Sequence, residues 1–215
     1  FIVDDLPEAF AIPVSLTTIC DDELDPLTQD GKFAFDTSSF ETTILKEQTG
    51  MIVKYFDANG NSLPSPLPNP FITGTQNVKV IVENPLNTTC VATISIPFII
   101  DPIPKISINI DGTEDKLVCT NLPTFFVQLD AGIQDGSPIS NYTYVWSKDG
   151  VVLPNETEYT LSVNAGGLYT VEVINNVGCG SIRTIKVTAS DLADIQAIDV
   201  VDMNDLNTVT INVTG

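Results

Sequence analysis

Apolar and polar residues alternate with a period of two in most segments that lie between turn-forming residues. In residues 142–147, Tyr142, Tyr144 and Trp146 occupy alternate positions, and the other segments are likewise rich in β-branched and aromatic side chains. Gly, Pro, Asn and Asp separate these segments, as is typical of short strands joined by turns. No segment keeps a helical i, i+3, i+4, i+7 pattern for more than two turns. The sequence therefore predicts an all-β protein.

The predicted strands form three groups along the chain. They are residues 12–19, 32–37, 52–56, 77–83 and 91–100, then 105–110, 125–130, 142–147, 159–163, 168–174 and 181–188, and finally 195–201 and 208–214. Residues 41–46 are expected to form at most one short helix. Short strands at this spacing are typical of β-sandwiches.

A short segment containing Asp and Pro occurs twice and divides the chain into units. Residues 3–7 are Val-Asp-Asp-Leu-Pro, residues 100–104 are Ile-Asp-Pro-Ile-Pro, and each precedes a strand-like segment that leads to a cysteine. Because proline restricts its own φ and the residue before it, we expect stiff, extended joints and an elongated array of domains. The predicted division is residues 1–7 as a linker, 8–101 and 102–189 as two sandwiches, and 190–215 as the opening strands of a truncated third repeat.

The four cysteines, Cys20, Cys90, Cys119 and Cys179, lie far apart, and no Cys-x-x-Cys pair suggests zinc or thioredoxin-like chemistry. Disulfides are the simpler interpretation, and three connectivities are possible. Pairing within each predicted domain gives Cys20–Cys90 and Cys119–Cys179. Such bonds persist outside the cytosol. We therefore expect a piece of a longer exported protein, with its targeting signals elsewhere.

Charge and composition exclude several function classes. The formal net charge is −19, and a field of this sign repels phosphate backbones and anionic lipid headgroups. Nucleic acid binding and membrane insertion are therefore not expected. The absence of histidine removes Ser-His-Asp and Cys-His nucleophiles and His-ligated zinc. Paired carboxylates remain formally possible, but short connections provide no pocket-forming insertion, so we expect no enzyme.

The residues of the first unit resemble a known family. The matching segments are Ile19-Cys20-Asp21-Asp22, residues 30–36, 48–51, 55–60 and 69–71, and Val82-Glu83-Asn84-Pro85 before Cys90. They resemble a repeat type of the long cell-surface adhesins of gliding Bacteroidota, which are exported by type IX secretion and carry tandem immunoglobulin-like repeats. The second unit is similar to a companion immunoglobulin-like or PKD-like repeat, through residues 146–150, 167–171 and 178–179.

The second unit departs from a true immunoglobulin domain at its cysteine positions. There, a cysteine two residues after the tyrosine-corner Tyr links the two sheets behind the Trp. Here position 171 is Val, and Cys179 lies beyond that strand in a turn. A bond from Cys179 would therefore hold an edge or an end of the sandwich. Trp146 is expected to be a core residue rather than a ligand platform.

An acidic segment follows Cys20 directly. Residues 21–30 contain five carboxylates, and Asp21, Asp22, Asp25 and Asp30 are candidate calcium ligands, with Asp36 as a possible addition. Calcium accepts six to eight oxygens, and the resemblance favours such a site, although Pro26 rules out an EF-hand. The alternative is a solvated acidic loop. Residues 57–61 also offer oxygens, but their Asn-Gly pair favours a hairpin turn.

The expected function is mechanical. The resemblance implies a stalk segment of an adhesin involved in attachment and gliding motility, located at the cell surface and non-catalytic, with calcium as a candidate stiffening ion. Its expected partners are neighbouring repeats of the same chain, with surface polysaccharide as a further candidate. The alternative is a carbohydrate-binding module, which is also small, extracellular and all-β. Aromatic residues make up only 7% of the chain, mostly at alternating strand positions, which favours the stalk.

Overall fold

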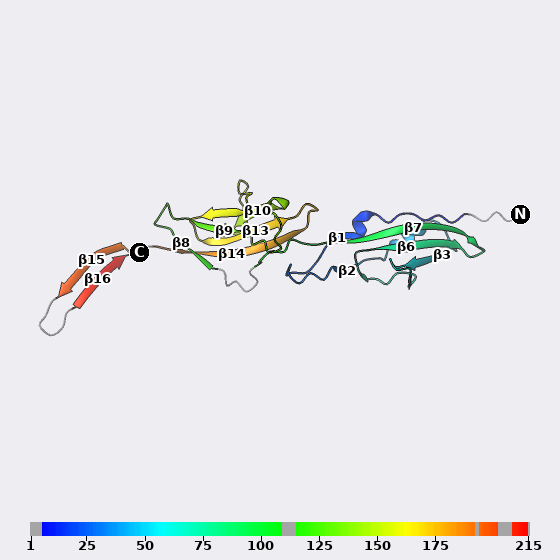
Figure 1. Cartoon of the computed structure of the whole chain (residues 1–215), viewed down its shortest axis with the longest axis horizontal. Coiled ribbons are helices and arrows are strands. Elements are labelled where there is room, and N and C mark those ends of the chain that lie inside the picture. The colour runs from blue at the N-terminus through cyan, green and yellow to red at the C-terminus, as the bar shows by residue number, and fades with distance from the viewer. Residues whose placement is uncertain (1–5, 109–114, 192–193, 202–207, 215) are drawn as a thin grey trace. The chain divides into compact units, whose positions relative to one another are not determined.

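The computed structural model describes residues 6–108, 115–191, 194–201 and 208–214, and it confirms an all-β protein (Figure 1). The chain divides into two compact units, Phe1–Ile103 and Pro104–Gly215, which we call unit 1 and unit 2. Their boundary lies two residues after the predicted end of the first sandwich. Most of the predicted linker, residues 1–5, lies outside the described residues. No described helix is long and apolar enough to cross a membrane.

Unit 1 is built from two sheets. A five-stranded sheet has the order β1-β7-β6-β3-β4, and β2 pairs with β5 in a second sheet. The strands are β1 (Thr18–Cys20), β2 (Lys32–Phe35), β3 (Ile52–Phe56), β4 (Ser62–Leu63), β5 (Phe71–Gly74), β6 (Gln76–Asn84) and β7 (Asn87–Asp101). A 3₁₀-helix, η1 (Val14–Leu16), and the predicted short helix, α1 (Phe40–Leu45), complete the unit.

The core of unit 1 follows from the alternation in β6 and β7. Val78, Val80 and Val82 point from β6 into the core and are fully buried. Phe98 of β7 lies at the centre of an aromatic cluster, because its ring contacts those of Phe35, Phe40 and Phe71 at centroid separations between 4.8 and 6.1 Å. The period-two pattern therefore selects which residues form the core.

Unit 2 repeats this arrangement with different side chains. Its five-stranded sheet has the order β11-β10-β13-β14-β8, and β12 pairs with β9. The strands are β8 (Asp115–Cys119), β9 (Val127–Asp130), β10 (Thr143–Lys148), β11 (Val151–Val152), β12 (Thr160–Val163), β13 (Gly167–Ile174) and β14 (Gly180–Ser190), with a 3₁₀-helix η2 (Ile139–Asn141). Trp146 is a core residue as expected: it is fully buried, and its Nε1–H donates to the Glu158 carbonyl at 2.9 Å.

In both units the first named strand pairs in parallel with the last strand of the five-stranded sheet. β1 runs parallel to β7, and β8 runs parallel to β14. The remaining pairs within the two large sheets are antiparallel. The two units therefore share one topological plan, which makes it possible to compare their residues position by position.

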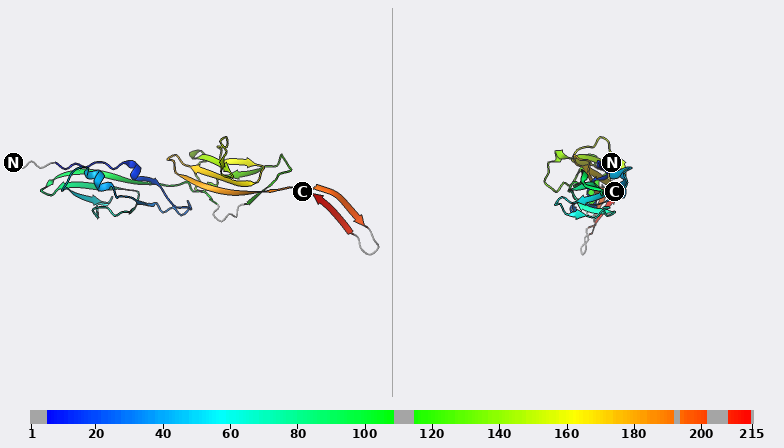
Figure 2. Two further views of the ribbon diagram at one scale, coloured as in Figure 1. Left: turned by 180° about the vertical axis from the view of Figure 1, so that it is seen from behind. Right: turned by 90° about the vertical axis from the view of Figure 1, so that its right-hand side faces the viewer.

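The predicted strands at residues 195–201 and 208–214 form an antiparallel hairpin of β15 (Asp194–Val201) and β16 (Thr208–Thr214), seen from behind in Figure 2. Its cross-strand register puts six β-branched residues on one face. The pairs are Ile195 with Val213, Ile198 with Ile211, and Val200 with Val209, and all six side chains are more than half exposed. That this hairpin opens a third repeat stays a prediction.

Two of the predicted strands differ from the structure. Residues 12–19 form the 3₁₀-helix η1 and only the short strand β1, because Pro13 fixes φ and supplies no N–H for a strand ladder. Residues 105–110 contribute a single bridge between Ile106 and Ile133, and residues 109–110 lie outside the described part of the chain. The first strand of unit 2 is instead β8, which the sequence pattern did not indicate.

Candidate functional site

The cysteine pairing is different from the predicted one. Cys20 and Cys179 are the disulfide-bonded cysteines, whereas Cys90 and Cys119 are free. Cys20 belongs to unit 1 and Cys179 belongs to unit 2. The expected pairs Cys20–Cys90 and Cys119–Cys179 are therefore wrong.

Strand geometry explains why neither expected pair can form. In unit 1, Cys20 is paired with Asp101 at the end of β7, and Cys90 lies eleven positions earlier on the same strand. In unit 2, Cys119 is paired with Ser190 at the end of β14, eleven positions after Cys179. Eleven strand residues span about 36 Å, whereas a disulfide requires Cα atoms within about 7 Å. The two cysteines of each unit thus lie at opposite ends of it.

The end of unit 1 that carries Cys20 also fixes the last residue of that unit. The Ile103 N–H donates to Gln29 Oε1 at 2.8 Å, and Gln29 Nε2 donates to the Ile103 carbonyl at 3.0 Å. The same Nε2 donates to the Pro26 carbonyl of its own loop. Because Ile103 is buried, both of its backbone polar groups need such partners. The loop after Cys20 therefore holds the chain where it leaves unit 1.

The end of unit 2 that carries Cys179 fixes the first residue of that unit. The buried Ser181, two residues after Cys179, donates its hydroxyl to the Pro104 carbonyl at 2.8 Å. The Gln134 N–H donates to the Lys105 carbonyl at 2.9 Å. Gln29 and Ser181 were not among the sequence-predicted residues. The one feature of the sequence that could have indicated them is that each lies within ten residues of a cysteine.

The acidic segment brings three carboxylates together. One oxygen from each of Asp21, Glu23 and Asp30 lies within 4.8 Å of the other two. Asp21 is buried, and its Oδ2 accepts the Gly31 N–H at 2.9 Å while its Oδ1 accepts the Glu23 N–H at 3.4 Å. Glu23 Oε2 is buried and has no hydrogen-bond partner among the described residues. Oxygens of this kind are what calcium binds, so these three residues fit part of such a site.

Three of the predicted ligands do not join this group. Asp25 Oδ1 accepts the Leu27 N–H at 2.9 Å within its own turn, and Asp22 is exposed. Asp36 Oδ1 accepts the Ser38 N–H at 2.9 Å. Hydrogen bonds from the Ser38 side chain and backbone hold the pKa of Asp36 below its usual value. Asp21 and Asp30 remain candidates because their oxygens converge, although Asp30 also accepts the Lys32 N–H at 2.8 Å and pairs with Lys32 Nζ at 3.4 Å. Glu23 is the residue that sequence analysis missed.

The alternative oxygen-rich segment at residues 57–61 is a turn, as predicted. It joins β3 to β4, and the Gly60 N–H donates to the Asp57 carbonyl at 3.0 Å. Hydrogen bonds from the Asn61 side chain and then its backbone lower the pKa of Asp57. Its carboxylate oxygens are therefore engaged within the turn.

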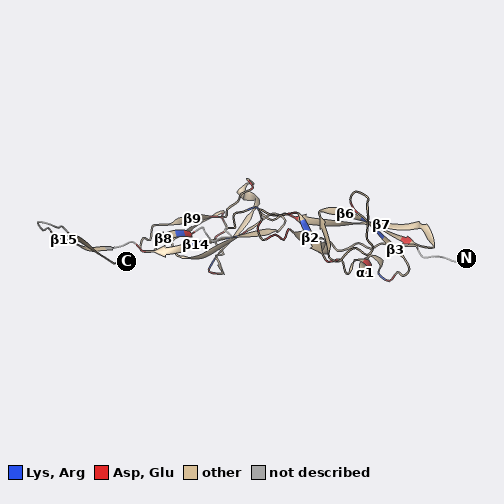
Figure 3. Cartoon of the chain, turned by 90° about the horizontal axis from the view of Figure 1, so that it is seen from below, with Lys and Arg blue, Asp and Glu red and all other residues tan. Residues whose placement is uncertain are grey.

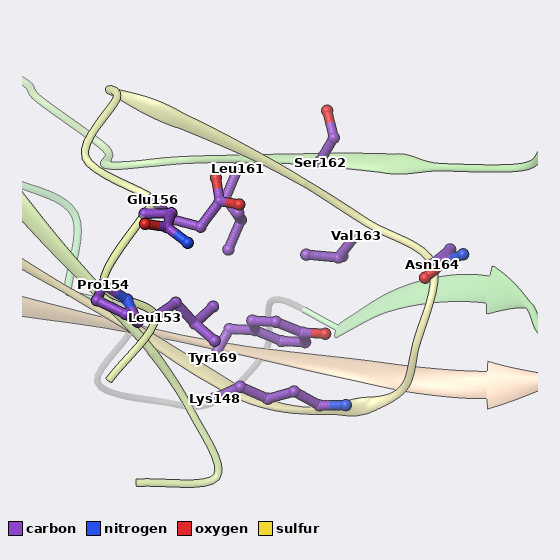
Figure 4. A pocket seen from close by; sticks show the side chains of 10 residues that line it. Lys148, Leu153, Pro154, Glu156, Leu161, Ser162, Val163, Asn164 and Tyr169 are labelled. Carbon is purple, nitrogen blue, oxygen red and sulfur yellow. The ribbon is translucent and has the colours of Figure 1, made fainter. Parts of the chain in front are cut away.

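Unit 2 contains a cavity of about 300 Å³ beside β12, shown in Figure 4. Its lining combines apolar and polar side chains: Lys148, Leu153, Pro154, Asn155, Glu156, Leu161, Ser162, Val163, Asn164 and Tyr169. Tyr169 is only 3% exposed, and its hydroxyl donates to the Ala165 carbonyl at 3.0 Å. The aromatic ring of this cavity is therefore a buried wall and not an open stacking surface.

Charged residues are sparse along the strands, which are mostly tan in Figure 3. Ion pairs between described residues include Lys32–Asp30 at 3.4 Å, Lys54–Glu83 at 2.6 Å and Lys186–Asp115 at 3.5 Å. All six side chains are at least partly exposed, so these pairs contribute little to stability.

Part of the chain is similar to a known domain family. Residues 16–104, nearly all of unit 1, match the family described as the Flavobacterium inter-domain disulphide bond domain. No curated protein matches the chain. One solved structure with some likeness is the Bacteroides ovatus mixed-linkage glucan utilization locus protein SGBP-B in complex with a mixed-linkage heptasaccharide. The identity is 16%, the match covers 86% of this chain and 44% of that chain, and the TM-score is 0.24, which is too low to support any argument.

The chain therefore spans less than half of the length of that solved structure. The family match rests on unit 1 alone and names the kind of bond that Cys20 and Cys179 form. Disulfides of this kind are typical of proteins outside the cytosol. Unit 1 is similar to the Flavobacterium inter-domain disulphide bond domain.

Proposed function

We propose that this chain is a stiff, non-catalytic spacer in the stalk of a cell-surface adhesin that takes part in attachment and gliding motility. The observation that carries the proposal is the disulfide between Cys20 of unit 1 and Cys179 of unit 2. A covalent bond in addition to the peptide linker gives two successive domains two connections instead of one. Two connections restrict the hinge motion that a single linker would permit.

The linker itself supports the same proposal. Pro102 and Pro104 restrict the backbone on either side of Ile103. Gln29 binds both polar groups of Ile103 within unit 1, and Ser181 binds the Pro104 carbonyl within unit 2. Few rotatable bonds remain free between the two anchored residues. A linker held in this way transmits force and orientation along a stalk.

The net charge of −19 fits a stalk that must stay soluble and apart from its neighbours. The adhesin assignment, gliding motility and export by type IX secretion rest on the resemblance of unit 1 and on the disulfide, which is typical of proteins outside the cytosol. The partners in this proposal are neighbouring repeats of the same polypeptide. No chemical step is assigned to the chain.

Calcium is part of the proposal, with a revised ligand set. The ligands would be Asp21, Glu23 and Asp30, since these carboxylates converge and Glu23 Oε2 is buried without a partner among the described residues. Asp21 follows Cys20 directly, and Asp30 follows Gln29. A cation here would therefore stiffen the loop that carries both connections to the next domain.

Glycan binding is the second candidate function, and the cavity beside β12 is the observation that favours it. Its lining combines the hydrogen-bonding side chains of Asn155, Glu156 and Asn164 with apolar side chains, a combination found in ligand sites. The buried Tyr169 ring makes it the weaker candidate. Titration with surface polysaccharide fragments, on the wild-type chain and on Glu156→Gln, would distinguish it from a spacer.

The spacer proposal is tested by measuring how the two units tumble. Backbone ¹⁵N relaxation should give one common rotational correlation time for both units in the oxidised chain, and two shorter ones in Cys179→Ser. Small-angle scattering should give an elongated particle in the oxidised form. Independent tumbling of the two units in the oxidised chain would contradict the proposal, because the disulfide would then impose no stiffness.

A further inference from the structure

The five-stranded sheet of unit 1 has an outer face, turned away from the core, that carries a hollow of about 460 Å³. We call it the β6 hollow, because its lining is centred on Asn77, Lys79 and Ile81 of β6, with Phe56 of β3 and Ser95 of β7 beside them. The β3–β4 turn lines it as well. Small-molecule sites commonly have volumes of about 300–1,000 Å³. The β6 hollow lies in unit 1 and is separate from the cavity beside β12, which lies in unit 2.

The strand register places Lys79 at the centre of this face. Its neighbours along β6, Val78 and Val80, are fully buried, so the side chain of Lys79 lies on the opposite, outer face. Lys79 is paired with Phe56 on one side and with Ser95 on the other. Directly paired residues have Cβ atoms about 4.5–5.5 Å apart, so these three side chains form a row across three strands.

The lining of the β6 hollow combines two kinds of side chain around this cation. Phe56 and Ile81 are half-buried and supply apolar surface. Asn77 and Ser95 are exposed and supply an amide and a hydroxyl, each of which can both donate and accept hydrogen bonds. Asn77 and Ile81 lie two positions before and after Lys79, so all three share one face of β6. Apolar surface with a few polar groups is the usual composition of a ligand site.

The positive charge of Lys79 is not neutralised within the described part of the chain. Its ammonium group has no ion-pair or hydrogen-bond partner there, whereas the neighbouring cation on the same face, Lys54, is paired with Glu83 at 2.6 Å. The one acid that lines the β6 hollow is Asp57. Its Oδ1 accepts the Asn61 N–H at 2.8 Å and its Oδ2 accepts Asn61 Nδ2–H at 2.9 Å, so both oxygens are engaged within the turn. Lys79 can therefore pair with an anion from outside.

The β3–β4 turn that lines the β6 hollow is fixed in place by hydrogen bonds. The Ala58 N–H donates to Gln76 Oε1 at 3.2 Å, which attaches the turn to the first residue of β6. Gln76 Nε2 in turn donates to the hydroxyl of the buried Thr73 at 2.5 Å. Within the turn, the Gly60 N–H donates to the Asp57 carbonyl at 3.0 Å. The shape of the hollow is therefore formed in advance, which lowers the ordering cost of binding.

We propose that the β6 hollow binds a saccharide unit that carries a carboxylate. The Lys79 ammonium group donates a charge-assisted hydrogen bond to the carboxylate, while Asn77 and Ser95 bind the ring hydroxyls. Phe56 and Ile81 pack against the apolar C–H groups of the ring. The net charge of −19 gives no long-range attraction to an anion, but at physiological ionic strength that field is screened beyond about 8 Å. Selectivity for the carboxylate therefore comes from direct contact with Lys79.

The inference goes beyond the spacer function, because it gives unit 1 a ligand of its own. It is tested by ¹H–¹⁵N NMR titration of the oxidised chain with a disaccharide of glucuronic acid linked to glucose. Cellobiose is the matched probe, since it carries a hydroxymethyl group in place of the carboxylate. The acidic disaccharide should shift the amide signals of Phe56, Lys79 and Ser95 at millimolar concentration, and cellobiose should bind about tenfold or more weakly, as expected without a charge-assisted hydrogen bond.

Two variants with the same change of net charge separate a local contact from a general charge effect. Lys79→Gln should weaken binding of the acidic disaccharide by about 10- to 100-fold and remove its advantage over cellobiose. Lys54→Gln should leave the affinity unchanged, since Lys54 does not line the β6 hollow. Both residues are exposed, and the dispersion of the NMR spectrum checks that each variant is folded.

Three results would overturn the inference. One is the absence of any shift at millimolar acidic disaccharide. Another is a set of shifts at Asn155 and Asn164 in place of the β6 hollow, which would locate binding beside β12. The third is equal affinity for cellobiose or for an alanyl-glutamate dipeptide, which would remove the selectivity for a carboxylate or for a saccharide. The tumbling test of the spacer does not depend on any of these results, so the two proposals fail separately.

Discussion

Gln29 pairs with the backbone of Ile103 across 74 positions of sequence, through one hydrogen bond in each direction. A single side chain thus makes the two hydrogen bonds to Ile103 that a neighbouring strand would otherwise make. It closes the acidic loop onto the last residue of unit 1. The stability of that loop and the position of the linker are therefore coupled.

Gln29→Ala should lower the free energy of unfolding of unit 1 by about 1–3 kcal/mol, because it leaves the buried Ile103 N–H and carbonyl without partners. Chemical denaturation measures the loss, and amide hydrogen exchange at Ile103 should speed up. Gln29→Glu retains the acceptor but not the donor, so its free energy of unfolding should lie between those of the wild type and Gln29→Ala. Gln128→Ala is the control, since Gln128 is exposed and its side chain donates to the Thr160 hydroxyl and not to a buried backbone group. Equal exchange at Ile103 in all variants would argue against this coupling.

Gly132→Ala should destabilise unit 2 for two reasons that can be separated. Gly132 has φ +70°, and a Cβ there would lie 2.9 Å from Cδ of the buried Arg183, which donates to the Ser107 carbonyl. Gly136 has φ +73° with no atom within 4 Å of its Cβ position, so Gly136→Ala reports the backbone strain alone. We expect about 1 kcal/mol for Gly136→Ala and roughly 2–4 kcal/mol for Gly132→Ala by thermal unfolding. Equal losses would show that Arg183 moves aside without cost.

Period-two alternation was sufficient to predict most strands and the core. The predicted segments 52–56 and 208–214 coincide with β3 and β16, and the alternating Trp146 is buried as expected. The alternation was informative because each five-stranded sheet buries one face. It failed at β8, where Asp115 and Lys116 begin the strand and Val118 is its one fully buried residue. A short edge strand of this kind carries too little apolar signal.

The cysteine pairing could not be predicted by assigning neighbours to the same domain. That argument assumed that a disulfide serves the fold of one domain, whereas each unit here has a complete core without it. The relevant signal was the parallel pairing of β1 with β7 and of β8 with β14, which only the fold reveals. Glu23 was missed for a related reason, because the turns at Asp21 and Asp25 decide which carboxylates converge.

Tyr55→Phe should stabilise unit 1. Tyr55 is fully buried, and its hydroxyl has no hydrogen-bond partner among the described residues. Removing an unsatisfied buried polar group should raise the free energy of unfolding by about 1–3 kcal/mol at neutral pH. The matched control is Tyr144→Phe, which removes a hydroxyl that donates to the Ile139 carbonyl at 2.7 Å and should be destabilising. A loss of stability in Tyr55→Phe would indicate a partner for the hydroxyl, such as a bound water.

The same residue predicts how stability depends on alkaline pH. Burial, and then the negative charge of Glu41, raise the pKa of Tyr55 well above its usual value near 10. The folded state therefore holds this proton more tightly than the unfolded state. The contribution of this proton to the free energy of unfolding is complete below pH 10 and is lost as the pH rises through the folded pKa. Above pH 10 the wild-type chain should lose about 1.4 kcal/mol per pH unit from this group. The pH slope in Tyr55→Phe should be smaller by that amount.

Calcium should raise the melting temperature of unit 1 if Asp21, Glu23 and Asp30 hold a cation. For a site with a dissociation constant of about 10⁻⁴ to 10⁻³ M, calcium at about 10 mM adds roughly 1.4–2.7 kcal/mol to the folded state. In Glu23→Gln the shape of the side chain is kept but its charge is lost, so the calcium-dependent gain should disappear. In chelator the same variant should be as stable as the wild type or more so, because carboxylate repulsion is reduced. Asp22→Asn is the control, since Asp22 is exposed and outside the cluster, and it should keep the full response. If the wild-type melting temperature is the same in chelator and in calcium, the segment is a solvated acidic loop and the disulfide and linker contacts alone must supply the stiffness.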